Sequence, residues 1–215
     1  MARTKLVYPK MPGSSAAPLA SCIAFDKCDG TNFHGVWDAE FGWHAFGTRR
    51  DRFDLDETGI AEFNAAHSGL EDAAEIFLNK LAEPLQAIIA AQGCYDSTEI
   101  IAFTEYLGPN SFAGAHKAVD EKQLVLFDLQ IAAGILSPEM FVQDFAMLSI
   151  PRVVYRGKLT GKFTTEVREG KFRVSEGVVC KGGKTGEVWM VKIKTNAYME
   201  RLQDTFAQDW KNYWE

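Results

Sequence analysis

Apolar residues recur at two different spacings along the chain, and each spacing predicts a different kind of element. In segment 71–92 they fall at three- and four-residue steps, which is the period of an amphipathic helix, and Gly93 follows as a stop signal. Pro84 lies inside this segment, and we expect a kink or break there because proline has no N–H to donate. Ser137 followed by Pro138 predicts a second helix start.

A third helix is expected to close the chain, with one apolar face formed by Met199, Leu202, Phe206, Trp210 and Tyr213. Short apolar or alternating runs predict the strands, which are expected at 20–25, 33–37, 42–47, 98–104, 123–129, 152–156, 171–174, 176–181 and 187–194. Residues 108–116 are expected to form a loop. Strands and helices interleave without a regular βαβ rhythm, so the pattern favours an α+β fold of antiparallel sheets flanked by helices.

Charge is distributed unevenly along the chain, whose net charge is −6. Residues 151–195 contain eleven Lys or Arg and four Asp or Glu, a local balance of +7, which leaves −13 elsewhere. A basic face on an acidic body can bind phosphates, because screening confines the interaction to roughly 10 Å. A solvated basic hairpin would give the same numbers, and charge alone does not separate the two interpretations.

Length and the remaining composition narrow the class of protein. The 215 residues suffice for one substantial core and are expected to form a single domain. No apolar run approaches the roughly 20 residues that span a bilayer, and the N-terminus lacks the apolar stretch of a signal peptide, so cytoplasmic residence without membrane contact is expected. The four cysteines and four histidines show no CxxC or HExxH spacing, and we do not expect a zinc site.

The most informative segment for chemistry surrounds Lys27, which lies at the end of an apolar strand before the tight turn at Asp29 and Gly30. A free lysine has a pKa near roughly 10.4 and is a poor nucleophile at neutral pH. Partial burial and neighbouring cations would lower that pKa and release the lone pair. A plain turn capped by Asp29 and Gly30 is the alternative interpretation of this segment alone.

Two later segments place charged groups on predicted strands. Glu176 and Lys181 would point to opposite faces of one strand unless a bulge or turn intervenes, which Gly177 would allow. Lys192 and Lys194 are two residues apart on a strand and therefore share a face, where an anion such as a triphosphate would relieve their repulsion. The alternatives are a buried strand with polar ends and an edge strand protected by lysines.

One nearby motif is misleading. Segment 182–185, Gly-Gly-Lys-Thr, resembles the end of a Walker A loop. That motif needs a glycine at position 178, which is valine here, and a following helix that is not predicted. We therefore expect a β-turn between two strands.

Taken together and in order, six segments resemble the motifs of the covalent nucleotidyltransferase superfamily of ATP-dependent ligases and RNA-capping enzymes. The six segments are Lys27-Cys28-Asp29-Gly30, Thr48-Arg49-Arg50, Glu105-Tyr106-Leu107-Gly108, Phe127-Asp128, Glu176-Gly177-Val178-Val179-Cys180-Lys181 and Lys192-Ile193-Lys194. Asn32 and the early segment 8–12 are similar to phage-type RNA ligases rather than to DNA ligases or capping enzymes. The resemblance implies a nucleotidyltransferase domain, the ATP-grasp-like adenylation domain of ligases, over residues 1–215, without a separate OB-fold or other C-terminal domain.

The resemblance also implies a role for each matched residue. Lys27 would attack the α-phosphate of ATP, Phe127 would stack on adenine, and Glu105 would hold the ribose hydroxyls. Glu176 would help to bind Mg²⁺, with Mn²⁺ as another option. The nucleotide-binding set would comprise Asp29, Gly30, Asn32, Arg49, Arg50, Glu105, Phe127, Glu176, Lys181, Lys192 and Lys194. Arg49 or Arg50 would contact ribose or a nucleic-acid phosphate, and the sequence does not separate the two.

The implied activity is that of an ATP-dependent RNA ligase. AMP would pass from Lys27 to a 5′-phosphate end of RNA, and a 3′-hydroxyl would displace it. The sequence leaves open a need for an accessory protein that grips the substrate. Alternatives are a DNA ligase, a guanylyltransferase of the mRNA-capping type, and a non-catalytic nucleotide- or RNA-binding module.

Overall fold

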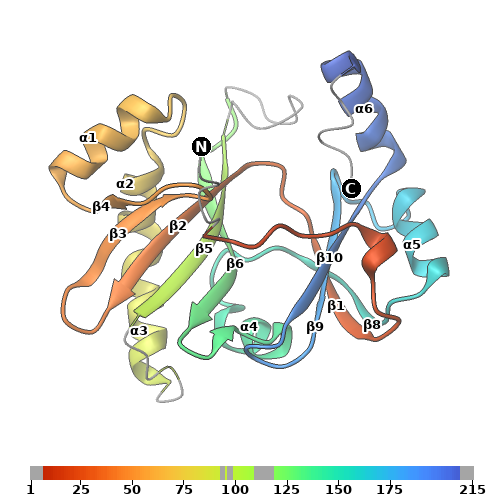
Figure 1. Ribbon diagram of the computed structural model, residues 1–215, viewed down its shortest axis with the longest axis horizontal. Coiled ribbons are helices and arrows are strands. Elements are labelled where there is room, and N and C mark those ends of the chain that lie inside the picture. The colour runs from red at the N-terminus through yellow and green to blue at the C-terminus, as the bar shows by residue number, and fades with distance from the viewer. Residues whose placement is uncertain (1–6, 93–94, 96–98, 109–118, 209–215) are drawn as a thin grey trace, which may run out of the picture.

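The structure, a computed structural model, describes residues 7–92, 95, 99–108 and 119–208. Two antiparallel sheets form its centre, and helices flank them (Figure 1). The architecture is therefore α+β with antiparallel sheets flanked by helices, which confirms the fold class that the sequence predicted. Within these described ranges, no helix combines the length and apolarity needed to cross a membrane.

The larger sheet has six strands in the order β4-β3-β2-β5-β6-β7. They are β2 (Thr31–Asp38), β3 (Gly42–Thr48), β4 (Phe53–Asp54), β5 (Glu99–Leu107), β6 (Gln123–Ile131) and β7 (Gly134–Ile135). β2 pairs with β5 over its whole length, so that Asn32 lies opposite Glu105. The four predicted strand segments in this part of the chain all form.

The smaller sheet has four strands in the order β10-β9-β1-β8. They are β1 (Ser21–Asp26), β8 (Val153–Lys158), β9 (Gly177–Gly182) and β10 (Trp189–Lys194). β9 and β10 pair antiparallel, and the Gly-Gly-Lys-Thr segment lies where β9 ends and the connection to β10 begins. The predicted turn is confirmed, and no helix follows this segment before β10.

The helices divide between the two sheets. α1 (Glu57–Ala66), α2 (Ala73–Phe77), α3 (Glu83–Ala91) and α4 (Pro138–Phe145) share one hydrophobic cluster with the six-stranded sheet, in which Phe33, Phe63 and Phe77 are fully buried. α5 (Gly161–Arg168) packs on the four-stranded sheet through Phe163 and Val167. α6 (Asn196–Phe206) continues directly from β10, and a 3-10 turn covers Ser14–Ala16.

The predicted interruption of helix 71–92 is present. A π-helical segment, Leu78–Ala82, separates α2 from α3, and Pro84 occupies the first turn of α3. Proline cannot donate to a carbonyl four residues earlier, so the wider π turn takes up the break in the hydrogen-bond ladder. Ser137 caps α4 as expected, since its hydroxyl accepts from the N–H of Met140.

Four sequence expectations need revision or a limit. Segment 171–174 forms turns rather than a strand, and helices α1 and α5 were not anticipated. The inward face of α6 is formed by Tyr198 and Leu202, while Met199 and Phe206 are only partly buried. Trp210, Tyr213 and most of the expected loop 108–116 lie outside the described residues.

The inner faces of the two sheets meet in a third cluster that includes Phe103, Val179 and Met190. An N-terminal arm, residues 7–13, crosses between the sheets (Figure 1). Its Val7 N–H donates to the carbonyl of Arg49 after β3, and its Pro12 carbonyl accepts from the N–H of Lys192 in β10. The arm therefore ties the two sheets together on the side where the candidate site lies.

Candidate active site

Lys27 follows the last residue of β1, and its backbone N–H donates to the carbonyl of Gly177 at 2.9 Å. Its ammonium donates to Glu176 Oε2 at 2.8 Å, and the other oxygen of Glu176 lies 3.6 Å from Lys194 Nζ. The side chain of Lys27 is 20% exposed and that of Glu176 only 4%. The three residues that the motif comparison grouped are thus brought into direct contact from distant parts of the chain.

Gly177 makes this contact possible. It begins β9 so close to β10 that an added Cβ would lie 2.0 Å from the carbonyl oxygen of Ile193. Glu176 therefore precedes the strand rather than belonging to it, and its carboxylate turns toward Lys27 and Lys194. The freedom expected of Gly177 is used for a close approach of two backbones.

The surroundings of Lys27 raise its pKa, contrary to the expectation that neighbouring cations would lower it. Burial lowers the pKa of Lys27, but the carboxylates of Glu176, Glu105 and Asp29 raise it more, so that it lies above its ordinary value. Glu176, at 2.8 Å, has the largest raising effect. The sequence predicted that the lysines lie close together, but it did not predict how close the carboxylates of Glu176, Glu105 and Asp29 lie to Lys27.

Lys192 and Lys194 do share the inner face of the four-stranded sheet, as predicted from their spacing. Burial, then the charges of Lys194 and Lys27, lower the pKa of Lys192 to about 8. Burial likewise lowers the pKa of Lys194, which is 6% exposed. Two amines held in this way favour an anion beside them.

Asp29, Gly30, Asn32 and Glu105 lie together at the turn between β1 and β2. The N–H of Gly30 donates to Glu105 Oε1 at 3.1 Å, and Asp29 Oδ1 accepts from the hydroxyl of Tyr198 at 3.0 Å. Burial raises the pKa of Glu105 to about 7, against the lowering effect of Lys27.

A pocket of about 420 Å³, partly open to solvent, lies between the two sheets. Side chains from both sheets and from the N-terminal arm line it: Met11, Phe25, Asp26, Lys27, Cys28, Glu105, Phe127, Pro151, Val179 and Lys181. Its apolar walls with a few charged groups are typical of a small-molecule site. Lys27, Glu105, Phe127 and Lys181 were all predicted to line one site, and the structure brings them together.

A β-bulge places both Phe127 and Asp128 on the pocket side of β6. The register of β5 and β6 shifts so that Phe103 pairs with Asp128 and Thr104 with Leu126, which leaves Phe127 as the extra residue. Phe127 lines the pocket, and Asp128 lies 2.7 Å from Lys181 Nζ. Lys181 also donates to the carbonyl of Phe127 at 2.8 Å.

The Asp128–Lys181 pair is buried and continues into the N-terminal arm. Both side chains are at most 5% exposed, and the hydroxyl of Tyr8 donates to Asp128. The ring of Tyr8 packs edge-on against Phe127, with centroids 5.2 Å apart. Burial lowers the pKa of Lys181 while Asp128 raises it, and the net direction is downward.

The two arginines that the sequence left unresolved occupy different positions. Arg49 donates to the carbonyls of Tyr8 and Pro9 and so holds the N-terminal arm, whereas Arg50 is exposed. The turn that carries them is capped by Asp51, which accepts from Thr48 and lies 2.8 Å from His67. Neither arginine is among the residues that line the pocket.

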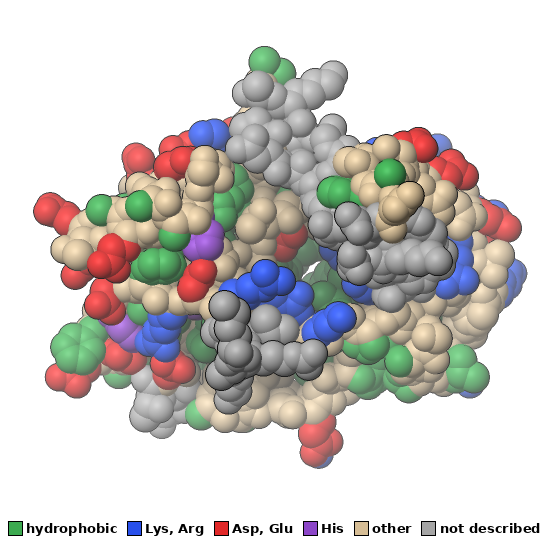
Figure 2. All heavy atoms as spheres, turned by 45° about the horizontal axis from the view of Figure 1, so that its top comes forward, with side chains coloured by type: hydrophobic (Ala, Val, Ile, Leu, Met, Phe, Trp, Pro, Cys, Tyr) green, Lys and Arg blue, Asp and Glu red, His purple; other side chains and the backbone are tan. Residues whose placement is uncertain are grey.

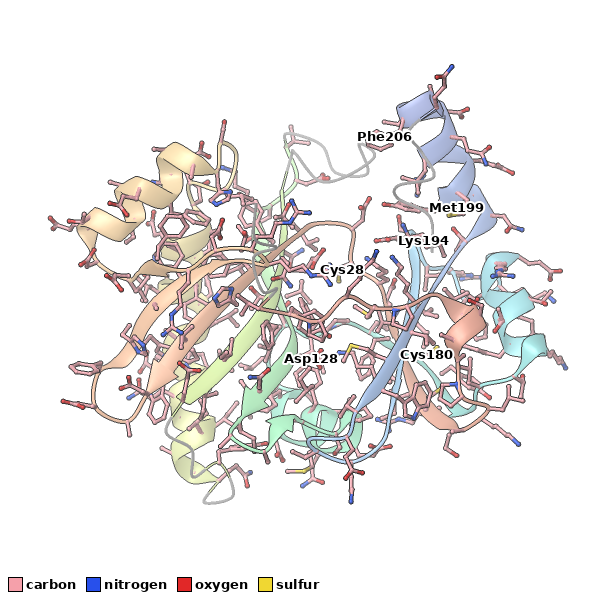
Figure 3. All side chains as sticks on the ribbon, viewed as in Figure 1. Cys28, Asp128, Cys180, Lys194, Met199 and Phe206 are labelled. Atoms are coloured by element: carbon pink, nitrogen blue, oxygen red, sulfur yellow. The ribbon has the colours of Figure 1, made fainter. Side chains whose placement is uncertain are left out.

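Basic side chains gather on one face of the molecule. In Figure 2, Lys and Arg side chains gather in a hollow at the centre of one face, with most carboxylates of this face toward its rim. In Figure 3, Cys28, Asp128 and Lys194 lie in the region between the two sheets, while Cys180 lies within the smaller sheet. The arrangement can bind an anionic ligand whose apolar part enters the pocket.

Two contributors to the site were not recognised from the sequence. Tyr8 and Met11 of the arm line or support the pocket, and only the similarity of segment 8–12 to RNA ligases hinted at them. Tyr198 contacts Asp29 across a sequence separation of 169 residues. No local pattern could have indicated that contact.

The fold of this chain is similar to the fold of solved ATP-dependent RNA ligases. Neither a family model nor a curated protein sequence matches the chain. Solved structures do match. A variant of the RNA ligase of Naegleria gruberi with ATP and manganese has a TM-score of 0.64 at 16% identity, covering 95% of this chain and 60% of that one.

Other matches agree. The Naegleria gruberi ligase with pyrophosphate has a TM-score of 0.58 at 14% identity, over 95% of this chain and 63% of that one. An archaeal ATP-dependent RNA ligase has a TM-score of 0.57 at 15% identity, over 93% and 51%. At this identity the likeness establishes the fold, and this chain spans about three fifths of the length of the Naegleria ligase.

Proposed function

We propose that this protein is an ATP-dependent RNA ligase that adenylylates itself on Lys27, transfers AMP to a 5′-phosphate end and seals that end to a 3′-hydroxyl. The observation that supports it most is that Glu176 contacts both Lys27 and Lys194, and that Lys27 lines a pocket together with Phe127 and Glu105. The fold shared with RNA ligases favours RNA over other acceptors.

In the first step the Lys27 amine attacks the α-phosphorus of ATP. As the P–N bond forms and the P–O bond to pyrophosphate breaks, the nitrogen loses one proton to solvent; before that, the Lys27 ammonium must give up another proton to become the attacking amine. Glu176 Oε2 lies 2.8 Å from Nζ and is placed to receive that proton. Because the pKa of Lys27 is raised, proton removal is part of the barrier rather than a property of the resting site.

The remaining charged groups act by position. Lys192 and Lys194 lie beside Lys27 and would neutralise the α-phosphate and the departing pyrophosphate. Phe127 would stack on adenine, since its ring borders the pocket. Glu105, Asp29 and Asn32 would line the ribose side of the nucleotide.

A Mg²⁺ or Mn²⁺ ion fits the donor chemistry at Glu176. Magnesium in nucleotide enzymes is commonly held by one or two carboxylates together with substrate phosphates. In the part of the chain that the structure describes, no group of three or more His, Cys, Asp or Glu could hold a metal alone, so phosphate oxygens would complete the coordination. Such an ion would supply Lewis-acid polarisation of the phosphate.

The second and third steps need a nucleic-acid surface. The basic hollow in Figure 2 offers one, and exposed Arg50 would contact a phosphate of the RNA at its edge. An accessory protein that grips the RNA is also part of the proposal.

The test is mass spectrometry of the protein after incubation with ATP and Mg²⁺ or Mn²⁺. We expect one added AMP on the peptide that contains Lys27, and none in Lys27→Ala. Label from GTP instead would favour a capping-type guanylyltransferase. A DNA ligase would be favoured if the protein formed the adduct and sealed nicked DNA but not 5′-phosphorylated RNA. A non-catalytic module would be favoured if the protein bound ATP without forming any adduct.

A further inference from the structure

The first turn of α6 is tied to the turn that carries Lys27. The hydroxyl of Tyr198 donates to Asp29 Oδ1 at 3.0 Å, and both side chains are buried, at 1% and 5% exposure. The bond joins the last described helix to the first turn between the sheets. A buried hydroxyl and carboxylate that meet in this way hold two segments at a fixed distance.

Tyr198 is itself held from several directions. Its N–H donates to the hydroxyl of Thr195, the cap of α6. Its ring lies beneath two cations, with Lys194 Nζ at 5.2 Å and the Arg201 guanidinium at 5.3 Å from the centroid. The position of its hydroxyl is therefore fixed by the helix start and by ring contacts, not by Asp29 alone.

The same helix start also anchors Glu176. The N–H of Thr195 donates to the backbone carbonyl of Glu176 at 2.9 Å, and Arg201 donates to the carbonyl of Ser175 at 3.3 Å. One short stretch of chain, Thr195–Arg201, thus touches both segments whose side chains meet at the Lys27–Glu176 contact.

The Lys27–Gly30 turn has two further anchors. The N–H of Lys27 donates to Gly177 in the four-stranded sheet, and the N–H of Gly30 donates to Glu105 in the six-stranded sheet. Asp29 is the point of the turn that faces α6. Without the hydrogen bond from Tyr198, the middle of the turn would lose one of its links to that helix.

We propose that Tyr198 is a positioning residue for the candidate nucleophile, acting through Asp29 to hold the Lys27–Gly30 turn against α6. This inference rests on the proposed function for its catalytic consequence, since Tyr198 is not among the residues that line the pocket. Figure 3 shows Lys194 at the junction of β10 and α6, close to Tyr198 in the first turn of that helix.

The decisive variant is Tyr198→Phe, which removes the hydroxyl and keeps the ring under Lys194. We expect the single-turnover rate of lysyl-AMP formation at saturating ATP to fall about ten-fold, because small displacements of a nucleophile are costly. The ATP concentration that gives half the maximal rate should stay unchanged. The matched control is Tyr155→Phe, whose hydroxyl donates to the carbonyl of Lys158 at 3.0 Å in strand β8, and it should label at the normal rate.

A double-mutant cycle with Asp29→Asn separates positioning from a general effect on the fold. If Tyr198 acts through Asp29, the double variant should be no slower than the slower single variant. Equal rates for Tyr198→Phe and the unmodified protein would overturn the proposal. The proposal would also be overturned if the rate losses of Tyr198→Phe and Asp29→Asn multiplied in the double variant. It would likewise be overturned if the rate loss of Tyr198→Phe disappeared after correction for the fraction of folded protein.

Amide hydrogen exchange keeps this inference distinct from the proposed function. Tyr198→Phe should speed exchange at residues 27–30 while leaving β8 unchanged, whether or not an adduct forms. If the unmodified protein forms no adduct, the ligase proposal fails, and the exchange at 27–30 then decides the role of Tyr198. Unchanged exchange at this turn would overturn the proposal in either case.

Discussion

The ammonium of Lys27 and the carboxylate of Glu176 lie 149 residues apart in the chain and meet at 2.8 Å. The contact with Glu176 favours the protonated form of the candidate nucleophile. Glu176 is also 3.6 Å from Lys194, so a single carboxylate balances two amines. Any ligand that draws Glu176 away would lower the pKa of Lys27 and release its lone pair.

This relationship makes the reactivity of Lys27 dependent on Glu176. In the protein without nucleotide, Lys27 should react slowly with an amine-directed reagent at pH 8, because its raised pKa keeps the neutral fraction small. Glu176→Gln removes the nearest negative charge, lowers that pKa and should increase labelling several-fold. Peptide mass spectrometry measures the labelling of Lys27, with exposed Lys184 as the internal reference. Faster labelling of Lys27 in the unmodified protein than in Glu176→Gln would contradict a raised pKa of Lys27.

Lys192 should contribute to activity at the expense of stability. Its pKa in the folded protein is lowered to about 8, so between pH 8 and roughly 10.4 the unfolded chain binds more protons and stability rises with pH. Below pH 8 the penalty is fully present. Lys192→Met should therefore raise the melting temperature at pH 7, with a smaller gain at pH 10, and should slow adenylylation.

The control for this prediction is Lys184→Met, which replaces a lysine that is 76% exposed and should leave both quantities unchanged. A lower melting temperature for Lys192→Met at pH 7 would show that the lysine is a structural residue.

Lys194→Ala should behave differently, since Lys194 also contacts Glu176 and the Tyr198 ring. Its loss should reduce the melting temperature as well as the rate of adenylylation.

Local pattern was enough for most of the fold. The spacing in 71–92 and the position of Pro84 predicted both the helix and its interruption, because both depend on the chain within a few residues. Segment 171–174 was predicted as a strand and is not one, since the chain turns there directly after the C-terminus of α5, where the N–H of Lys171 donates to the carbonyl of Glu166. A short run of alternating residues does not contain that information.

The site could be predicted only as a set of residues. Motif order named Lys27, Glu105 and Glu176, but their separations in space and the direction of the Lys27 pKa depend on two sheets meeting. The bulge at Phe127 aims two adjacent side chains at one pocket, against the simple alternation of a strand. Contacts of this kind arise from tertiary packing and have no signature in a single segment.

The buried pair Asp128–Lys181 should be sensitive to the loss of one partner. Asp128→Ala leaves a buried ammonium without its carboxylate, and we expect a loss of about 3–5 kcal/mol in the free energy of unfolding. The double variant Asp128→Asn/Lys181→Met removes both charges and keeps an acceptor for Tyr8, so it should recover most of that loss. Urea unfolding measures both, and equal losses would argue against a buried charge pair.

Gly177 provides the most direct test of the backbone arrangement behind the site. A Cβ at this position would lie 2.0 Å from the carbonyl oxygen of Ile193, which is backbone and cannot rotate away. Gly177→Ala should therefore separate β9 from β10, cost about 1–3 kcal/mol of stability and slow adenylylation, because Glu176 moves with the strand start. Gly161→Ala is the matched control: nothing lies within 4 Å of its added Cβ, in the first turn of α5. Urea unfolding and adduct formation should show both the loss of stability and the slower adenylylation in Gly177→Ala, and neither in Gly161→Ala. A Gly177→Ala protein with normal stability would mean that β9 and β10 are not as close as described.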